Sequence, residues 1–198
     1  MNSITRTLTL GPPHGRLTGH LSRPDGTRTL IIVAHAGLHH DHPLVAPTLA
    51  TRHHALLAVD LFNRHEEHSH DPHQNAAQLA LRLLHFLDFA RNDGDTADLA
   101  LALYASGAAA PAAVRAGAQR DADVHAIVTY GGLIDHAGIQ YLEALAAPLL
   151  TLVERHDRAT ELATRRAFQH LRATHELHLI DPADAAAEAA AWFGLWLR

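Results

Sequence analysis

The chain has 198 residues, 47% of them hydrophobic and 19% charged, so it can fold as one domain with a full core and is unlike a disordered segment. The formal net charge is −5, and all 16 basic residues are arginine. A chain with this net charge is not expected to carry the basic surface that binds the phosphates of a nucleic acid, so we expect no nucleic-acid partner. The absence of cysteine excludes disulfides, thiolate metal ligands and a cysteine nucleophile.

The chain shows no signal for a membrane or for export. No apolar stretch approaches the roughly 20 residues that a membrane-spanning helix needs. Residues 1–6 do not place a charged region before an apolar one, as a signal peptide does. We therefore expect a single domain over 1–198, no membrane partner and a cytoplasmic location.

The hydrophobic pattern predicts strands that alternate with helices. Alternating residues at 4–10 and a short apolar segment at 17–21 flank a turn and predict two antiparallel leading strands. Further strands, several of them continuous apolar runs typical of a buried parallel sheet, are expected at 29–34, 55–61, 99–104, 124–130, 148–153 and 175–180. Helices are expected at 43–51, 74–91, 108–118, 158–171 and 183–197. The sequence thus predicts an α/β fold with a mostly parallel central sheet and helices on both faces.

Ligands of open α/β sheets bind at the carboxyl ends of the strands, so the segments that follow the strands are the candidates for chemistry. Several of these segments resemble the α/β-hydrolase fold, and within it the small dienelactone-hydrolase-like group. The similar segments are Val33–Gly37 (the oxyanion segment), Leu103–Ala110 (the nucleophile elbow), Tyr130–Gly132 with Asp135 and Gly138, Pro148–Asp157 (the acid loop) and His178–Pro182 (the histidine loop).

This resemblance implies a catalytic triad of Ser106 as nucleophile, His178 as base and Asp157 as the group that orients the base. It also implies an oxyanion hole made by the backbone N–H groups of Ala36 and Gly107. Such a hydrolase acts on a small-molecule substrate and requires no cofactor. At this chain length the fold has no lid.

Four features leave other interpretations open. The elbow pattern Gly-x-Ser-x-Gly has Tyr104 and Ala108 at its two glycine positions, and an alignment on the strand without a gap puts Gly107 at the nucleophile position. Asp157 is equally suited to cap the helix that follows it. His178 is equally interpretable as an ordinary strand residue, and Asp60, at the end of a buried strand, as a partner of loop N–H groups.

Eight of the 19 histidines fall in two segments that follow neighbouring strands. Imidazole and carboxylate ligands suit divalent transition metals. The spacings His-x-x-His and His-x-His select His39, His42, His68 and His70 as candidate metal ligands. In the alternative interpretation, histidine is simply the general polar residue of this chain.

The sequence therefore supports a leading hypothesis and two alternatives. The first is a small esterase or lactone-type hydrolase with a serine nucleophile. The second is a catalytically degenerate hydrolase scaffold that binds a ligand or holds a metal through the two histidine-rich segments. The third is a protein that works as a homodimer through its apolar C-terminal helix, with Trp192 and Trp196 as anchors.

Overall fold

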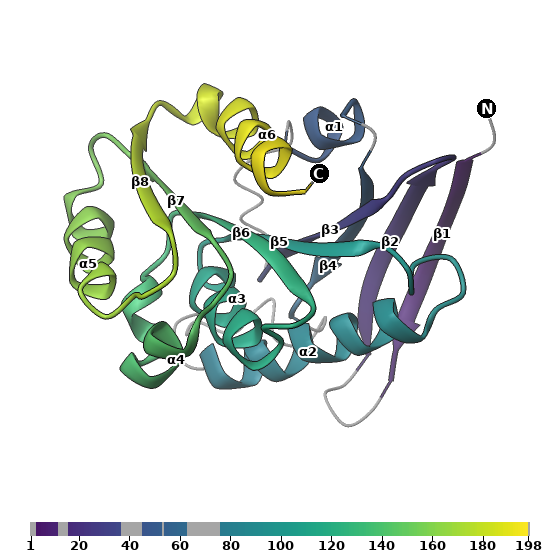
Figure 1. Ribbon diagram of the computed structural model, residues 1–198, viewed down its shortest axis with the longest axis horizontal. Helices are drawn as coiled ribbons and strands as arrows, with labels where there is room; N and C mark the ends of the chain where they lie inside the picture. The colour runs from purple at the N-terminus through teal and green to yellow at the C-terminus, as the bar shows by residue number, and fades with distance from the viewer. Residues whose placement is uncertain (1–2, 12–15, 37–44, 53, 63–75, 198) are drawn as a thin grey trace.

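The computed structural model describes residues 3–11, 16–36, 45–52, 54–62 and 76–197. These residues form one eight-stranded sheet with strand order β1-β2-β4-β3-β5-β6-β7-β8 (Figure 1). The strands are β1 (Ser3–Leu10), β2 (Leu17–Pro24), β3 (Thr29–His35), β4 (Ala55–Asp60), β5 (Ala100–Ser106), β6 (Val124–Tyr130), β7 (Leu149–Glu154) and β8 (His175–Ile180).

The sheet is antiparallel at one end and parallel elsewhere. Strand β1 pairs with β2 antiparallel, and β2 pairs antiparallel with β4, whereas every pairing from β4 to β8 is parallel. Residues of β1 alternate between exposed and half-buried, as expected of an edge strand with one face on the core. The predicted α/β architecture with two leading antiparallel strands is confirmed.

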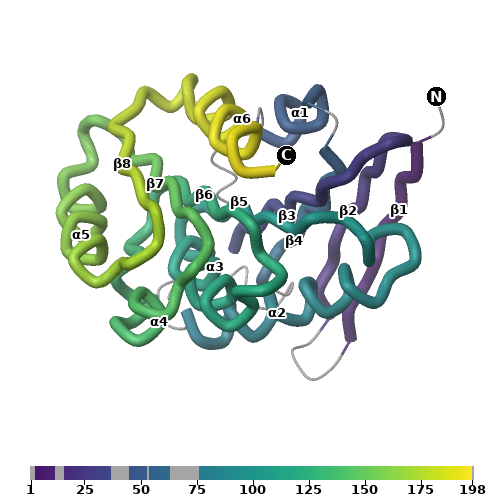
Figure 2. Tube along the Cα trace, viewed as in Figure 1, coloured from purple at the N-terminus to yellow at the C-terminus, as the bar shows by residue number. Residues whose placement is uncertain are grey.

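Helices cover both faces of the sheet, also as predicted. They are α1 (Val45–Ala50), α2 (Ala76–Asn92), α3 (Ala109–Gln119), α4 (Ile139–Ala144), α5 (Arg158–Phe168) and α6 (Ala185–Trp196), with short 3₁₀ turns η1 (Ile134–Ala137) and η2 (Pro182–Asp184). Helices α2 to α5 lie on one face, and α1 and α6 lie together on the other (Figures 1 and 2). No helix in the described ranges is long and apolar enough to cross a bilayer.

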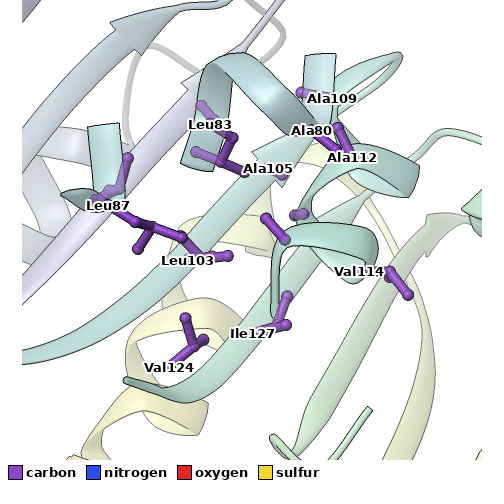
Figure 3. Close-up of a cluster of buried hydrophobic side chains, with 14 of the residues drawn as sticks. Ala80, Leu83, Leu87, Leu103, Ala105, Ala109, Ala112, Val114, Val124 and Ile127 are labelled. Carbon is purple, nitrogen blue, oxygen red and sulfur yellow. The ribbon is translucent and has the colours of Figure 1, made fainter. Parts of the chain in front are cut away.

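Small residues bring α3 close to the sheet. Its buried alanines face the middle of β5, and leucines of α2 pack beside them (Figure 3). Leu83 and Leu87 of α2 and Leu103 of β5 are almost fully buried, and complete burial of such a side chain stabilises a fold by roughly 1.5–3 kcal/mol. This packing fixes the position of the β5–α3 connection, which is where the predicted nucleophile elbow lies.

The other face of the sheet has its own core, closed by α1 and α6. Trp192 is 5% exposed there and belongs to that core, whereas Trp196 is 36% exposed. The two rings contact each other, with centroids 5.7 Å apart. Trp192 therefore packs α6 against the sheet of its own chain. Of the two tryptophans predicted as dimer anchors, Trp196 is the one that is exposed at the surface.

The structure differs from the prediction at the β5–α3 connection. Strand β5 continues to Ser106, two residues beyond the predicted end, and α3 begins at Ala109. Pro111 lies in the first helical turn, where a missing N–H costs no intrahelical bond. Ser106 is therefore the last residue of a strand rather than the apex of the turn.

Candidate active site at the carboxyl edge of the sheet

Gly107 is the apex of the turn between β5 and α3. Its φ is +54°, a left-handed conformation that favours glycine. Its N–H donates to the carbonyl of Tyr130 at 3.0 Å, and its own carbonyl accepts from the N–H of Ala110 at 3.1 Å. A sharp strand-to-helix turn of this kind presents the nucleophile in α/β-hydrolases. Here the residue at the apex is glycine, as the alignment without a gap predicts.

Ser106 lies one residue before the apex and pairs with Tyr130 of β6. Side chains alternate between the two faces of a strand. Tyr104, two residues earlier, belongs to the core under α1 and α6, and so does Tyr130. The side chain of Ser106 is therefore directed to this same face, at the carboxyl edge of the sheet, and it is half-buried.

His178 lies inside strand β8, and both of its ring nitrogens have carboxylate partners. Nδ1 is 2.8 Å from Oε2 of Glu188 on α6, and Nε2 is 2.9 Å from Oε2 of Glu176. Partial burial lowers the pKa of His178, but the hydrogen bonds to Glu188 and Glu176 outweigh it, and the net effect raises this pKa above its usual value.

The structure does not bring Ser106 and His178 together. Ser106 pairs with Tyr130, Tyr130 with Leu152, and Leu152 with His178, so the two residues stand in one row of the sheet. Three spacings between neighbouring strands separate them by roughly 14 Å, far beyond a hydrogen bond. The regular pairing of β8 keeps His178 at the sheet edge, in agreement with the alternative interpretation of His178 as an ordinary strand residue.

Asp157 is the N-cap residue of α5. Its Oδ1 accepts from the backbone N–H of Thr160 at 3.0 Å and thereby caps α5. This is the capping role that the sequence left open, because aspartate is a favoured N-cap residue. The predicted triad of Ser106, Asp157 and His178 is therefore not assembled in the structure.

The predicted oxyanion donors also need revision. The N–H of Gly107 already donates to Tyr130, so this donor is in use. The N–H groups of Ala108 and Ala109, at the start of α3, are better placed, because the first N–H groups of a helix have no intrahelical partner. Ala36 directly follows β3 at the same edge of the sheet.

A second histidine lies beside Ser106. His35 ends β3 and pairs with Asp60, which ends the neighbouring strand β4. The Nε2 of His35 is 3.9 Å from Oδ2 of Asp60, and the two side chains are 23% and 24% exposed. The other carboxylate oxygen of Asp60 accepts from the N–H of Phe62 at 2.9 Å, so the predicted bond to a loop N–H is confirmed.

The polar row continues on the far side of Ser106. The hydroxyl of Tyr130 donates to Oε1 of Glu154 at 2.5 Å. The final positions of β4, β3, β5 and β6 thus carry Asp60, His35, Ser106 and Tyr130 side by side. A sequence signal for this row existed, since each of these residues is the last residue of a mostly apolar strand, but the order of the strands in the sheet is not encoded in any one segment.

A cavity of about 320 Å³ opens at the elbow. It lies among α2, α3, η1 and α5, and its lining is mainly apolar. The lining residues are Ala76, Leu79, Gly107, Ala108, Pro111, Gly132, Leu133, His136 and Thr160. The apex of the turn and the start of α3 therefore face a space of the size of a small ligand.

The proposed metal ligands His39, His42, His68 and His70 lie outside the described residues. Within the described ranges, no group of three or more histidine or acidic side chains is arranged to hold a metal ion.

Comparison with solved structures shows similarity to hydrolases along the whole chain. A dienelactone hydrolase from Anabaena variabilis is 25% identical, has a TM-score of 0.90 and matches 99% of each chain. Est1E from Butyrivibrio proteoclasticus is 12% identical, with a TM-score of 0.77 over 96% of this chain and 97% of its own. A zinc-bound, cold-adapted esterase from an Arctic intertidal metagenomic library is 13% identical, with a TM-score of 0.78 over 99% and 95%.

Among curated sequences, candidate phosphoribosyl transferases from two strains of Mycobacterium tuberculosis are 30% identical over 155 residues. The match covers 76% of this chain, which spans only about a third (35%) of those relatives. No family model matches the chain. The chain is an α/β-hydrolase-fold protein, and its solved structural neighbours are dienelactone hydrolases and esterases.

Proposed function

We propose that the protein hydrolyses small carboxylic esters or lactones, with Ser106 as the nucleophile. The observation that carries this proposal is the β5–α3 turn at Gly107, which opens on a cavity in a chain that matches a dienelactone hydrolase from end to end. Ser106 is the last strand residue before this turn, and it does not line the cavity, because its side chain is directed to the face of α1 and α6. The proposal therefore places the scissile carbonyl at the carboxyl edge of the sheet and the rest of the substrate in the cavity.

The cavity supports a small and largely apolar substrate. Leu79, Leu133 and Pro111 offer an apolar surface for an acyl chain or a lactone ring, and His136 and Thr160 add two polar groups. A volume of about 320 Å³ lies at the lower end of the range of ligand pockets. Backbone N–H groups at the start of α3 are suited to a developing oxyanion. No step of this hydrolysis calls for a cofactor.

The test is hydrolysis of p-nitrophenyl acetate, butyrate and octanoate, and of a five-membered and a six-membered lactone. We expect the acetate or butyrate ester to be the best chromogenic substrate, and Ser106→Ala to abolish its hydrolysis. Ser22→Ala, on strand β2 away from the carboxyl edge, is the matched control and keeps full activity. Equal rates for Ser106→Ala and the unaltered protein would exclude Ser106 as the nucleophile.

The glycine at the elbow apex favours a second candidate function. Because Gly107 has no side chain, the turn itself carries no nucleophile, and the scaffold would then bind a ligand without cleaving it. In this proposal the histidine-rich segments hold a divalent transition metal. Protein purified without an affinity tag is expected to contain metal by elemental analysis and to melt at a higher temperature on addition of Zn²⁺ or Ni²⁺. A metal-free protein without such a rise contradicts the metal-holding function.

We also propose that two copies of the chain form a homodimer through α6. Leu195 and Trp196 are 52% and 36% exposed at the end of this helix. Light scattering after size exclusion tests it: we expect a dimer for the unaltered chain and a monomer for Trp196→Gln. A clean monomer at all concentrations contradicts the dimer.

A further inference from the structure

We propose that the cavity at the elbow is a binding site for a small aliphatic carboxylate, held by the hydroxyl of Thr160 and the backbone N–H of Ala108. The alkyl chain of such a ligand lies on the apolar wall formed by Leu79, Pro111 and Leu133. Binding of this kind goes beyond the ester hydrolysis proposed above and does not depend on it.

Thr160 is a buried polar residue that lines the cavity. Only 5% of this residue is exposed. Its backbone N–H donates to Oδ1 of Asp157 at 3.0 Å, and its hydroxyl has no hydrogen-bond partner among the described residues. A buried hydroxyl without a partner is unfavourable, so a ligand oxygen that accepts a hydrogen bond from Thr160 gains binding energy.

Thr164, one turn further along α5, differs from Thr160 in its access to the cavity. It is 0% exposed, and its hydroxyl also lacks a partner, but this oxygen is fully enclosed by protein atoms. The hydroxyl of Thr160 is not enclosed in this way, and the space that borders Thr160 is the cavity. The two threonines therefore form a matched pair on one helix, of which only Thr160 can reach a ligand.

The N-terminus of α3 supplies the second donor. This helix has 11 residues, no side-chain cap and no acidic residue in its first turn. The N–H of Ala110 donates to the carbonyl of Gly107 at 3.1 Å, and Pro111 has no N–H. The N–H of Ala108, which lines the cavity, has no acceptor among the described residues. Because the peptide dipoles of a helix add up along its axis, this end favours an anion.

Gly107 leaves room for the ligand directly before this donor. A Cβ atom at Gly107 would meet nothing within 4 Å, and Gly107 lines the cavity. In the elbow of an active α/β-hydrolase, the side chain of the nucleophile stands at this point. Here the space is open, so an oxygen atom of a carboxylate can approach the N–H of Ala108 from the side of the apex.

The charges around the cavity also favour an anion. The described lining contains no acidic residue, and its one titratable residue, His136, has an exposed ring that offers a further donor. The acidic side chains next to the lining residues are paired. Asp135 contacts Arg166 at 2.8 Å, and Glu161 contacts two arginines at 2.6 and 2.9 Å. These pairs reduce the repulsion that a bound anion would meet.

The apolar wall selects among anions. A strongly hydrated ion such as inorganic phosphate would lose its water here without enough donors to replace it. A carboxylate with a short alkyl chain needs few donors for its two oxygens, and its chain gains from burial against leucine and proline side chains. The cavity therefore fits a short-chain fatty acid better than an inorganic anion.

Isothermal titration calorimetry of the full chain with sodium acetate, butyrate and hexanoate tests this proposal. We expect one site per chain and a Kd for butyrate roughly tenfold lower than that for acetate, because two further methylene groups are buried. Inorganic phosphate and the neutral butyramide are expected to bind at least about tenfold more weakly than butyrate. If butyramide binds as tightly as butyrate, the site does not recognise the charge, and the proposal is wrong.

Variants of α5 test the role of Thr160. Thr160→Val removes the hydroxyl at nearly constant volume and is expected to raise the Kd for butyrate at least about tenfold. Thr160→Ser keeps a hydroxyl and is expected to retain most of the affinity. Thr164→Val is the matched control and is expected to bind butyrate as the unaltered chain does. Unchanged melting temperatures establish that the variants are folded. Equal affinities of Thr160→Val and Thr164→Val would exclude Thr160 as a ligand contact.

Nuclear magnetic resonance of the unaltered chain gives a readout that needs no variant. Butyrate is expected to shift the amide resonances of Ala108 and Thr160 in a saturable way, and to leave Gly117, near the other end of α3, unchanged. The absence of saturable shifts at Ala108 and Thr160 overturns the proposal. Ester hydrolysis that is observed without butyrate binding leaves the proposed function standing and excludes the carboxylate site.

Discussion

Gly132 lies directly against the carbonyl oxygen of Gly107. A Cβ atom on Gly132 would come within 2.1 Å of that oxygen, and the φ of Gly132 is +78°. The turn after β6 therefore supports the turn after β5, and the elbow keeps its shape only while residue 132 has no side chain. This contact links the two strand ends that border the cavity.

The first prediction concerns this contact. Gly132→Ala places a methyl group against the backbone of Gly107, which can shift only if the turn is distorted. The alanine must also adopt the left-handed backbone conformation of residue 132, which is unfavourable for a residue with a Cβ atom. We expect a loss of at least about 3 kcal/mol in the free energy of unfolding. Urea denaturation measures it.

Gly131→Ala is the matched control for this substitution. Its φ is +59°, but a Cβ there meets nothing within 4 Å, so only the conformational cost of about 1–2 kcal/mol applies. Equal losses for the two variants would mean that the contact between residues 132 and 107 does not constrain the elbow.

The second prediction uses the absence of cysteine from the chain. Gly107→Cys introduces a single thiol at the elbow apex, where a Cβ meets nothing within 4 Å and the cavity opens. We expect complete labelling by a small thiol reagent under native conditions. Ala105→Cys, at a fully buried position two residues earlier, is expected to react only after unfolding. A protected thiol at 107 would contradict the open apex.

The third prediction concerns the size of the substrate. Ala76 is the first residue of α2, is half-buried and lines the cavity. Ala76→Phe is expected to fill part of the cavity and to lower kcat/KM for p-nitrophenyl butyrate more than for the acetate. Leu81→Phe, on an exposed position of the same helix, is expected to change neither. If Ala76→Phe lowers kcat/KM equally for the butyrate and the acetate, the acyl chain does not bind in this part of the cavity.

The fourth prediction follows from the raised pKa of His178. A group whose pKa is higher in the folded than in the unfolded state stabilises the fold fully below the unfolded value and loses this effect as the pH rises through the folded value. His178→Gln is therefore expected to destabilise the fold more at about pH 6 than at about pH 9. Thermal unfolding at the two pH values measures the difference.

His175→Gln is the control for this pH dependence, since it alters the same strand without the carboxylate pair. Its Nδ1 contacts a backbone carbonyl, that of Ala173. A penalty for His178→Gln that is independent of pH would show that Glu188 and Glu176 do not favour the protonated ring.

Much of the fold was predictable because it depends on local patterns. The two alternating segments, the apolar runs and the helical spacing follow from burial on one or both faces of an element, which each segment encodes by itself. The turn η1 was not predicted, because an element of four residues carries too little periodicity. The role of Asp157 as the N-cap of α5 could be predicted from the sequence, because an aspartate directly before a helix is a local signal.

The sequence by itself determined the kind of sheet, the glycine at the nucleophile position of a gapless alignment and the exclusion of cysteine chemistry. Only the tertiary structure decided which polar side chains meet. Strand order put β3 between β4 and β5, so that Asp60, His35 and Ser106 became neighbours although up to 71 positions separate them along the chain. The same register moved His178 three strands away. A sheet joins residues across strands through pairing, and pairing is a property of the whole fold rather than of any one segment.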